Sequence, residues 1–285
     1  MNVNKRGALF DWLCDQLPVI LKEALFPTRC LICGGLYRTQ GRLSEKETVE
    51  LVLSQQRAAV FAGLMAVFLC PVCRNGFTPV ESPLCTCCGM LFGSREGEDH
   101  ICSECLQVPR HFDKARSAGI YGQALMESIH CFKYKEKIQL GMPLGMLLLA
   151  TLLAYWKQEC FDLVVPVPLH IKKLRKRGFN QSWHLVQRCD RLLRAMDLTT
   201  PYLQVAPDLL IRARPTEPQT GLGRRQRIGN VKNAFRLNGS KGLSAKRVLL
   251  VDDVYTTGAT VNECARTLKR GGADRVDVLT LARAV

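Results

Sequence analysis

The sequence predicts an α/β protein in which a parallel β-sheet flanked by helices follows an N-terminal zinc-binding module. Two patterns carry this prediction: a buried strand near the C-terminus that leads through two acids into a helix, and four Cys-x-x-Cys pairs that all lie before residue 106. The 285 residues suffice for about two folded units, and 47% hydrophobic against 23% charged residues is an ordinary globular composition. A largely disordered chain is therefore excluded.

The C-terminal pattern covers residues 247–281. Residues 248–251 (VLLV) are continuously apolar and rich in β-branched side chains, as expected of a strand buried on both faces. The acidic pair Asp252 and Asp253 ends this strand, and a Thr-rich turn then leads into a helical pattern that closes at Gly271-Gly272. A further strand is expected over residues 275–281, which completes a strand–loop–helix–strand unit of a parallel sheet.

The turn after the acidic pair predicts a site for a phosphorylated sugar. A helix N-terminus offers free backbone N–H groups and a positive dipole end, so it holds a phosphate. Gly258 permits close backbone approach, and the hydroxyls of Thr256, Thr257 and Thr260 offer further hydrogen bonds. The two carboxylates before the turn can accept hydrogen bonds from sugar hydroxyls or help to hold hydrated Mg²⁺. In the alternative interpretation, the two acids only cap a turn.

The cysteine pairs predict two structural zinc sites. Two thiolates three positions apart chelate one ion from a tight turn, and two such turns complete a tetrahedral site. Disulfides are disfavoured because nothing in the sequence marks the chain as exported. Pairing in sequence order is expected, although the spacing also allows an interleaved arrangement or one degenerate site. The ligands in that order are Cys30, Cys33, Cys70 and Cys73 for one ion, and Cys85, Cys88, Cys102 and Cys105 for the other.

The long segment between the first two cysteine pairs predicts an inserted helix. Ser44 and Glu47 have the spacing of a capping box, with apolar positions following at helical intervals. We therefore expect one helix over about residues 45–68.

The charge distribution divides the chain near Arg110. Residues 1–110 hold 11 Lys/Arg and 11 Asp/Glu, whereas residues 111–285 hold 29 and 14, so the net charge of +15 lies wholly in the second part. A field of this sign favours polyanions such as nucleic acids or diphosphates, with a solvated basic surface as the alternative. We place an amphipathic helix over residues 1–27, the zinc-binding module over 28–110 and the α/β domain over 111–285.

Two apolar stretches are interpreted as parts of a cytoplasmic protein without membrane insertion. Asp11 and Asp15 interrupt the N-terminal stretch, which argues against a signal peptide. The charge-free run of residues 138–156 contains Pro143 and two glycines, and a helix buried in a folded core explains it better than a membrane span.

Basic residues are concentrated in two groups that flank the predicted ligand site. One diphosphate needs only two or three cations, so the excess predicts contact with an extended phosphate backbone such as single-stranded DNA. Phe179, Trp183 and Phe235 are candidate stacking faces for bases, with membership of the core as the alternative. The cations that we assign to nucleic-acid binding are Lys172, Lys173, Arg175, Lys176 and Arg177 in the first group and Arg224, Arg225 and Arg227 in the second.

Four motifs together resemble known families. VLLVDDVYTTGAT, residues 248–260, resembles the signature of type I phosphoribosyltransferases that binds phosphoribosyl pyrophosphate (PRPP). VVPVPLHIKKLRKRGFNQS, residues 164–182, resembles the corresponding block of the ComF (ComFC-like) family of DNA-uptake proteins. The cysteine pairs resemble that family's double zinc ribbon. The T-x-x-Q…R-x-x-N…F pattern of this family is matched by Thr216, Gln219, Arg227, Asn230 and Phe235.

The resemblance implies a type I phosphoribosyltransferase fold from about residue 112 onward, with Mg²⁺ and PRPP or a related sugar phosphate as ligands. Asp252 and Asp253 would then be the catalytic pair that contacts the ribose hydroxyls, and residues 256–260, including Ala259, would hold the 5-phosphate. Leu169 and His170 would lie nearest the pyrophosphate. Residues 215–227 occupy the place of a mobile flap.

The motifs, the charge distribution and the family resemblance are consistent with three roles for the protein. In the first, a ComF-like protein handles incoming single-stranded DNA during natural transformation and uses the PRPP-type site as a platform for phosphate and sugar. The second is an active Mg²⁺-dependent phosphoribosyltransferase with an unidentified acceptor. In the third, which is compatible with the first, the zinc-binding half docks a partner such as a DNA-translocating helicase.

Overall fold

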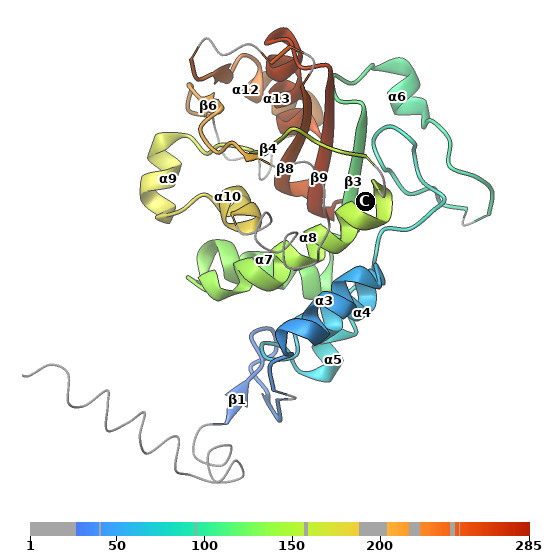
Figure 1. Ribbon diagram of the computed structural model, residues 1–285, viewed down its shortest axis with the longest axis vertical. Helices are drawn as coiled ribbons and strands as arrows, with labels where there is room; N and C mark the ends of the chain where they lie inside the picture. The colour runs from blue at the N-terminus through green and yellow to red at the C-terminus, as the bar shows by residue number, and fades with distance from the viewer. Residues whose placement is uncertain are drawn as a thin grey trace, which may run out of the picture.

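The computed structural model describes most of the chain that follows the N-terminal segment (Figure 1). The amphipathic helix predicted over residues 1–27 lies outside the described part, apart from Pro27, and so do the side chains of Arg224 and Arg225. The described residues are 27–39, 41–94, 96–156, 159–187, 204–216, 223–239, 243–244 and 246–285.

A five-stranded parallel sheet forms the centre of the molecule, as predicted. Its strands lie in the order β3-β9-β8-β4-β5, and neighbouring strands run parallel. The bounds are β3 Lys114–Ile120, β4 Leu163–Pro166, β5 Gln204–Val205, β8 Arg247–Tyr255 and β9 Arg275–Arg283.

Strand β8 is longer than the sequence predicts. The acidic pair does not end it: Asp252 pairs with Thr280 of β9, and the ladder continues to Tyr255. Parallel pairing with β9 therefore keeps the backbone extended past the apolar run. As a result, both carboxyl groups are mounted on the rigid end of a central strand.

Apolar side chains alternate along β8 between two hydrophobic cores. Leu249 and Val251 face the first core, whereas Val248 and Leu250 face the second. Helices α7 (Gln123–Tyr134), α8 (Gly141–Tyr155) and α10 (Gln181–Val186) contribute to the first core. Helix α13 (Ala259–Arg270) covers the other face, with α12 (Arg224–Val231) packed against it (Figure 1). A strand buried on both faces is thus confirmed.

The charge-free run is a core helix. Residues 138–155 have the length and hydropathy of a membrane-spanning helix, but they form a short 3₁₀ turn, Ile138–Leu140, followed by α8. Helix α8 packs against α10, α4 and the sheet, and Leu144, Leu147 and Leu148 are at most 1% exposed. This run therefore fills the protein interior, as predicted.

The cysteine-rich segment forms short elements around two turns: β1 Thr28–Arg29, β2 Leu36–Tyr37, α3 Glu45–Leu53, α4 Arg57–Leu64, α5 Pro71–Arg74 and α6 Ser103–Gln107. The capping box at Ser44 and Glu47 is confirmed, but the single helix predicted over 45–68 is wrong. Ser54 accepts a hydrogen bond from the Gln56 backbone N–H, and Gln55 adopts φ 58°, so the helix breaks there.

Three small elements surround the carboxyl end of the sheet. Helix α9 (Ile171–Arg177) follows β4, and β6 (Leu210–Arg212) pairs with β7 (Phe235–Leu237) in a two-stranded antiparallel ribbon. This ribbon brackets the segment predicted as a flap, of which residues 217–222 lie outside the described part.

Close packing of α8 on α10 gives a test of the core. A Cβ atom on Gly145 would lie 2.4 Å from the Leu185 carbonyl oxygen, so Gly145→Ala must push the two helices apart. We expect the free energy of unfolding to fall by about 1–3 kcal/mol, measured by urea denaturation. Gly229→Ala on exposed α12, where nothing lies within 4 Å of the added atom, is the matched control. Equal losses in both variants would contradict the packing argument.

Candidate functional site

The strand order places a crevice at the carboxyl ends of β4 and β8. From β4 the chain continues to one side of the sheet, to β5, whereas β8 continues to the other side, to β9. Ligands of open parallel sheets bind where the strand order reverses in this way. A cleft of about 590 Å³ lies here, and it is lined by Leu169 after β4, by Asp252 and Asp253 near the end of β8, and by the turn that follows β8.

The turn between β8 and α13 depends on Gly258. This residue adopts φ +73° and is the N-cap of α13. A Cβ atom here would lie 2.2 Å from the Tyr255 hydroxyl oxygen, so both the backbone conformation and the close approach require glycine. The 12-residue helix therefore begins directly at the cleft, where the positive end of its dipole favours an anion such as a phosphate.

Four of the five predicted phosphate-binding residues line the cleft: Thr256, Gly258, Ala259 and Thr260. Thr257 does not. Its hydroxyl oxygen accepts a hydrogen bond from the backbone N–H of Ala259 at 3.4 Å, so it braces the first turn of the helix.

The acidic pair is buried at the floor of the cleft, with Asp252 9% and Asp253 5% exposed. The carboxylate of Asp252 accepts hydrogen bonds from the Ser182 hydroxyl at 3.1 Å and from the Asp253 backbone N–H at 2.9 Å. Burial and the neighbouring Asp253 charge raise the pKa of Asp252 to about 7. This carboxyl group therefore changes its charge near neutral pH.

Lys133 is a site residue that the sequence did not identify. Its ammonium group lies 2.8 Å from a carboxylate oxygen of Asp253, and its side chain is only 13% exposed. Although burial opposes it, the charge of Asp253 raises the pKa of Lys133. The residue stands near the end of α7, about 120 positions before the acidic pair, and only the tertiary fold brings the two together.

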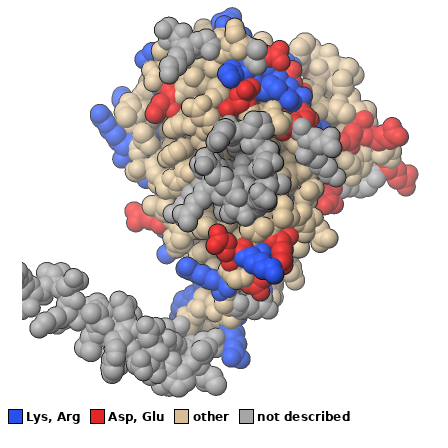
Figure 2. Space-filling model, in the orientation of Figure 1, with Lys and Arg blue, Asp and Glu red and all other residues tan. Residues whose placement is uncertain are grey.

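The basic residues of α9 fall into two sets, one that lines the cleft and one that does not. Lys173 and Arg177, four residues apart, line the cleft together with Arg212 and Arg227. Partial burial and the nearby Arg212 and Arg177 lower the pKa of Lys173, as expected where several cations converge. The remaining α9 cations are exposed and are not among the residues lining the cleft: Lys172, Arg175 and Lys176. Figure 2 shows basic side chains at the left edge of the molecule, where α9 lies in Figure 1.

The remaining predicted site residues are His170, Arg224 and Arg225. His170 is the N-cap of α9, where its ring nitrogen accepts a hydrogen bond from the Lys172 backbone N–H at 3.3 Å, and it is not among the residues lining the cleft. The side chains of Arg224 and Arg225 lie outside the described part of the chain.

The aromatic residues considered as stacking faces contribute to the cores. Phe235 is 6% exposed, and the Phe179 ring lies 5.4 Å from that of Phe132. Trp183 is partly buried against the first core. The core alternative is thus confirmed, because all three side chains pack against one of the two hydrophobic cores.

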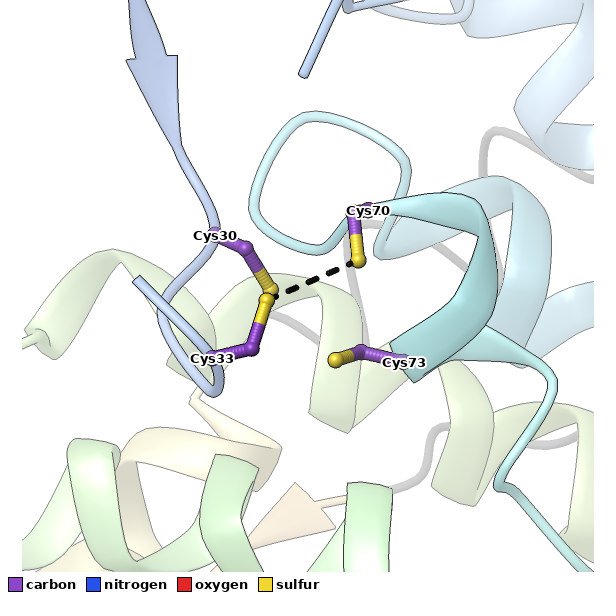
Figure 3. A group of neighbouring side chains, drawn as sticks. All are labelled: Cys30, Cys33, Cys70 and Cys73. Carbon is purple, nitrogen blue, oxygen red and sulfur yellow. Dashed lines mark hydrogen bonds between the residues drawn. The ribbon is translucent and has the colours of Figure 1, made fainter. Parts of the chain in front are cut away.

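The cysteine pairs assemble in sequence order into two clusters. Within each cluster, the four Sγ atoms all lie within 4.8 Å of one another. Figure 3 shows the thiols of the first cluster converging from the turn after β1 and from α5. The Cys33 and Cys70 sulfurs are 3.9 Å apart, and those of Cys88 and Cys102 are 3.8 Å apart. A tetrahedral site with Zn–S bonds of about 2.3 Å has sulfurs about 3.8 Å apart, so both clusters fit Zn²⁺.

Backbone N–H groups prepare the second cluster for metal binding. Cys85 accepts such contacts from Cys88 and Cys102, each at 3.4 Å. Although burial opposes it, these N–H groups lower the pKa of the Cys85 thiol to about 6. A thiolate is the form that binds zinc.

The second cluster is connected to the turn at Gly258. Arg283, at the end of β9, donates a hydrogen bond of 2.6 Å to the Cys88 carbonyl oxygen. The same guanidinium lies over the Tyr255 ring, 4.5 Å from its centre, and Tyr255 covers Gly258. The second cluster therefore supports the wall of the cleft, whereas Cys30 of the first belongs to the opposite core.

This connection predicts that the two clusters differ in their effect on the cleft. Cys88→Ser should lower the zinc content and weaken the binding of ribose 5-phosphate by about 2- to 30-fold, because Arg283 and Tyr255 lose their support. Cys33→Ser, the matched control, should lower the zinc content and leave that affinity unchanged. Metal analysis and calorimetry measure both. Equal weakening by the two variants would refute the connection.

The raised pKa of Asp252 predicts a pH-dependent stability. Between its ordinary value of 3.8 and about 7, the native state binds more protons than the unfolded chain, so the free energy of unfolding falls as pH rises. In Asp252→Asn, an amide that stays uncharged replaces the buried carboxyl group, so no charge has to form inside the protein as pH rises. We expect this variant to exceed the wild type by about 1–3 kcal/mol at pH 8 and to match it near pH 4. Urea denaturation at both pH values measures this, and a gain that is independent of pH would contradict the assignment.

Residues 203–284 match the phosphoribosyl transferase domain family. The DNA utilization protein YhgH of Escherichia coli K12 is 33% identical over 219 residues, which cover 75% of this chain and 90% of the relative. Competence protein F of Haemophilus influenzae is 31% identical over 231 residues, or 76% of this chain and 97% of the relative. Competence protein ComFC of Streptococcus pneumoniae is 25% identical over 262 residues, or 90% of this chain and all of the relative.

These likenesses agree with the architecture. The match to the phosphoribosyl transferase domain includes β8, the turn at Gly258, α13 and all of β9. The alignments with two relatives above 30% identity span at least 90% of each relative. The chain therefore has a phosphoribosyltransferase-type domain beside two four-cysteine clusters, and it belongs to the ComF family.

Proposed function

We propose that this protein handles single-stranded DNA during DNA uptake, and that its cleft holds a phosphorylated sugar while the outer side of α9 contacts the phosphate backbone. Relatives named for DNA utilization and competence support the biological setting. The observation that carries the molecular part is the division of the α9 cations. A cytoplasmic location and a DNA-translocating helicase as partner belong to the same proposal.

The division of α9 separates two kinds of ligand. Lys173 and Arg177 line the cleft, where a small phosphorylated ligand can reach them. Lys172, Arg175 and Lys176 are exposed outside it, where such a ligand cannot. An extended polyanion can contact this outer set, because its charges recur along the strand. One short helix thus serves a compact ligand and an extended one.

The cleft suits PRPP or a related sugar phosphate. The N–H groups at the start of α13 would bind the 5-phosphate, and Asp252 and Asp253 would accept hydrogen bonds from the ribose hydroxyls. Lys173 and Arg212 would face a pyrophosphate beside the loop at Leu169. Mg²⁺, when bound with the ligand, supplies further neutralisation of the diphosphate charge.

An active phosphoribosyltransferase is the second candidate. The buried carboxyl pair with Lys133 at 2.8 Å is the observation that favours it, since catalysis of this kind rests on positioning and charge stabilisation. Release of pyrophosphate from PRPP with any of a panel of nucleobases would establish turnover. Binding of PRPP without release of pyrophosphate would instead support the first role, in which the cleft binds a sugar phosphate and catalyses no transfer.

The outer face of α9 can be tested separately from the cleft. A variant with Lys172, Arg175 and Lys176 each changed to Gln should bind fluorescent oligo(dT) more weakly, and its salt slope should shrink by about 2. Its affinity for PRPP with Mg²⁺ should stay unchanged in calorimetry.

Asp252→Asn/Asp253→Asn is the matched control, with the opposite expectation: PRPP binding is lost and oligo(dT) binding is kept. Salt-independent binding of oligo(dT), or absence of binding by the wild type, would overturn the DNA part of the proposal.

A further inference from the structure

An exposed aromatic residue stands at the mouth of the cleft. Tyr134, the last residue of α7, is 66% exposed and lines the same cleft as the acidic pair. It follows Lys133, whose ammonium contacts Asp253. A planar surface therefore stands beside the groups that would hold the sugar.

Arg177 completes this surface. Its guanidinium lies over the Tyr134 ring, 5.0 Å from the ring centre. The same guanidinium donates a hydrogen bond of 2.6 Å to the side-chain oxygen of Gln181, which is 6% exposed. A buried partner thus fixes the orientation of Arg177. The stacked pair is preformed, and ordering it would cost little entropy on binding.

Two polar rings continue the surface toward the interior of the cleft. The His130 ring lies one turn before Tyr134 and meets it edge to face, with 5.8 Å between the ring centres. A nitrogen of His130 is 2.9 Å from the Tyr121 hydroxyl. All four side chains line the cleft. The mouth therefore combines planar faces with groups that can donate and accept hydrogen bonds.

This combination fits one class of ligand. Nucleobases bind proteins by stacking on aromatic rings and on Arg guanidinium planes, with hydrogen bonds at their polar edges. A diphosphate has no planar face that could stack on the Tyr134 ring, which remains 66% exposed. The three aromatic residues first considered as stacking faces, Phe179, Trp183 and Phe235, are not among the residues that line the cleft.

We propose that Tyr134 and Arg177 form a stacking site for a nucleobase at the mouth of the cleft, with His130 and Tyr121 beside the polar edge of the base. When the base belongs to a free nucleotide, its sugar and phosphate occupy the acidic pair and the start of α13, so this inference rests on the proposed function. The base belongs either to a free nucleotide or to single-stranded DNA, which present the same ring.

Matched ligands isolate the contribution of the base. Adenosine 5′-monophosphate and ribose 5-phosphate share the sugar and the phosphate, and oligo(dT) and an abasic oligonucleotide of equal length share the backbone. In calorimetry, the wild type should bind each base-containing ligand about 5- to 100-fold more tightly than its base-free counterpart. The nucleotide pair tests a free base, and the oligonucleotide pair tests a base in DNA.

Substitutions of Tyr134 test whether its ring provides the contribution of the base to affinity. Tyr134→Ala should abolish the advantage of the base-containing ligand and leave the base-free affinity unchanged, whereas Tyr134→Phe should retain the advantage. Because Tyr134 is exposed, we expect both variants to keep the melting temperature of the wild type.

The outcomes separate the two proposals. If ribose 5-phosphate and the abasic strand bind and the bases add nothing, the stacking site is wrong and the proposed function stands. A base advantage that survives Tyr134→Ala also overturns the stacking site. If neither base-free ligand binds the wild type, both proposals fail.

Discussion

The left-handed turn at Gly258, held beneath the Tyr255 ring, is the constraint on which the cleft depends. It converts the central strand β8 into α13 within a few residues, so that the start of the helix faces the end of the sheet. Tyr255 closes the turn from one side, and Arg283 covers Tyr255 and reaches the second cysteine cluster. A four-cysteine cluster in the N-terminal part of the chain thereby supports the wall of a cleft formed by the C-terminal part.

Charge inside the cleft is arranged around two buried carboxyl groups. Lys133 neutralises Asp253 directly, while Ser182 and a backbone N–H satisfy Asp252. The cations at the rim outnumber these acids, so the cleft attracts anions while its floor offers acceptors for hydroxyl groups. A phosphorylated sugar carries both kinds of group. Beyond the rim, the outer cations of α9 extend the same field over the surface.

Local sequence patterns predicted the elements whose signals are local. The strand–turn–helix from β8 into α13 and the Ser44 cap depend on residues near one another in the chain, and both elements were predicted, although β8 extends past the acidic pair. The expected pairing of the cysteines in sequence order is confirmed as well. The break at Gln55 was missed because no glycine marks the residue that adopts a positive φ there. Lys133 and Tyr134 could not be found, because only the packing of α7 beside β8 brings them to the acidic pair. The division of α9 likewise required the helix orientation.

The most direct test of this account is a crystal structure of the protein with PRPP and Mg²⁺. We expect the 5-phosphate on the backbone N–H groups at the start of α13 and the ribose hydroxyls against Asp252 and Asp253, with the Gly258 turn unchanged. PRPP bound elsewhere on the molecule, or a turn at Gly258 that rearranges to exclude the phosphate, would contradict it.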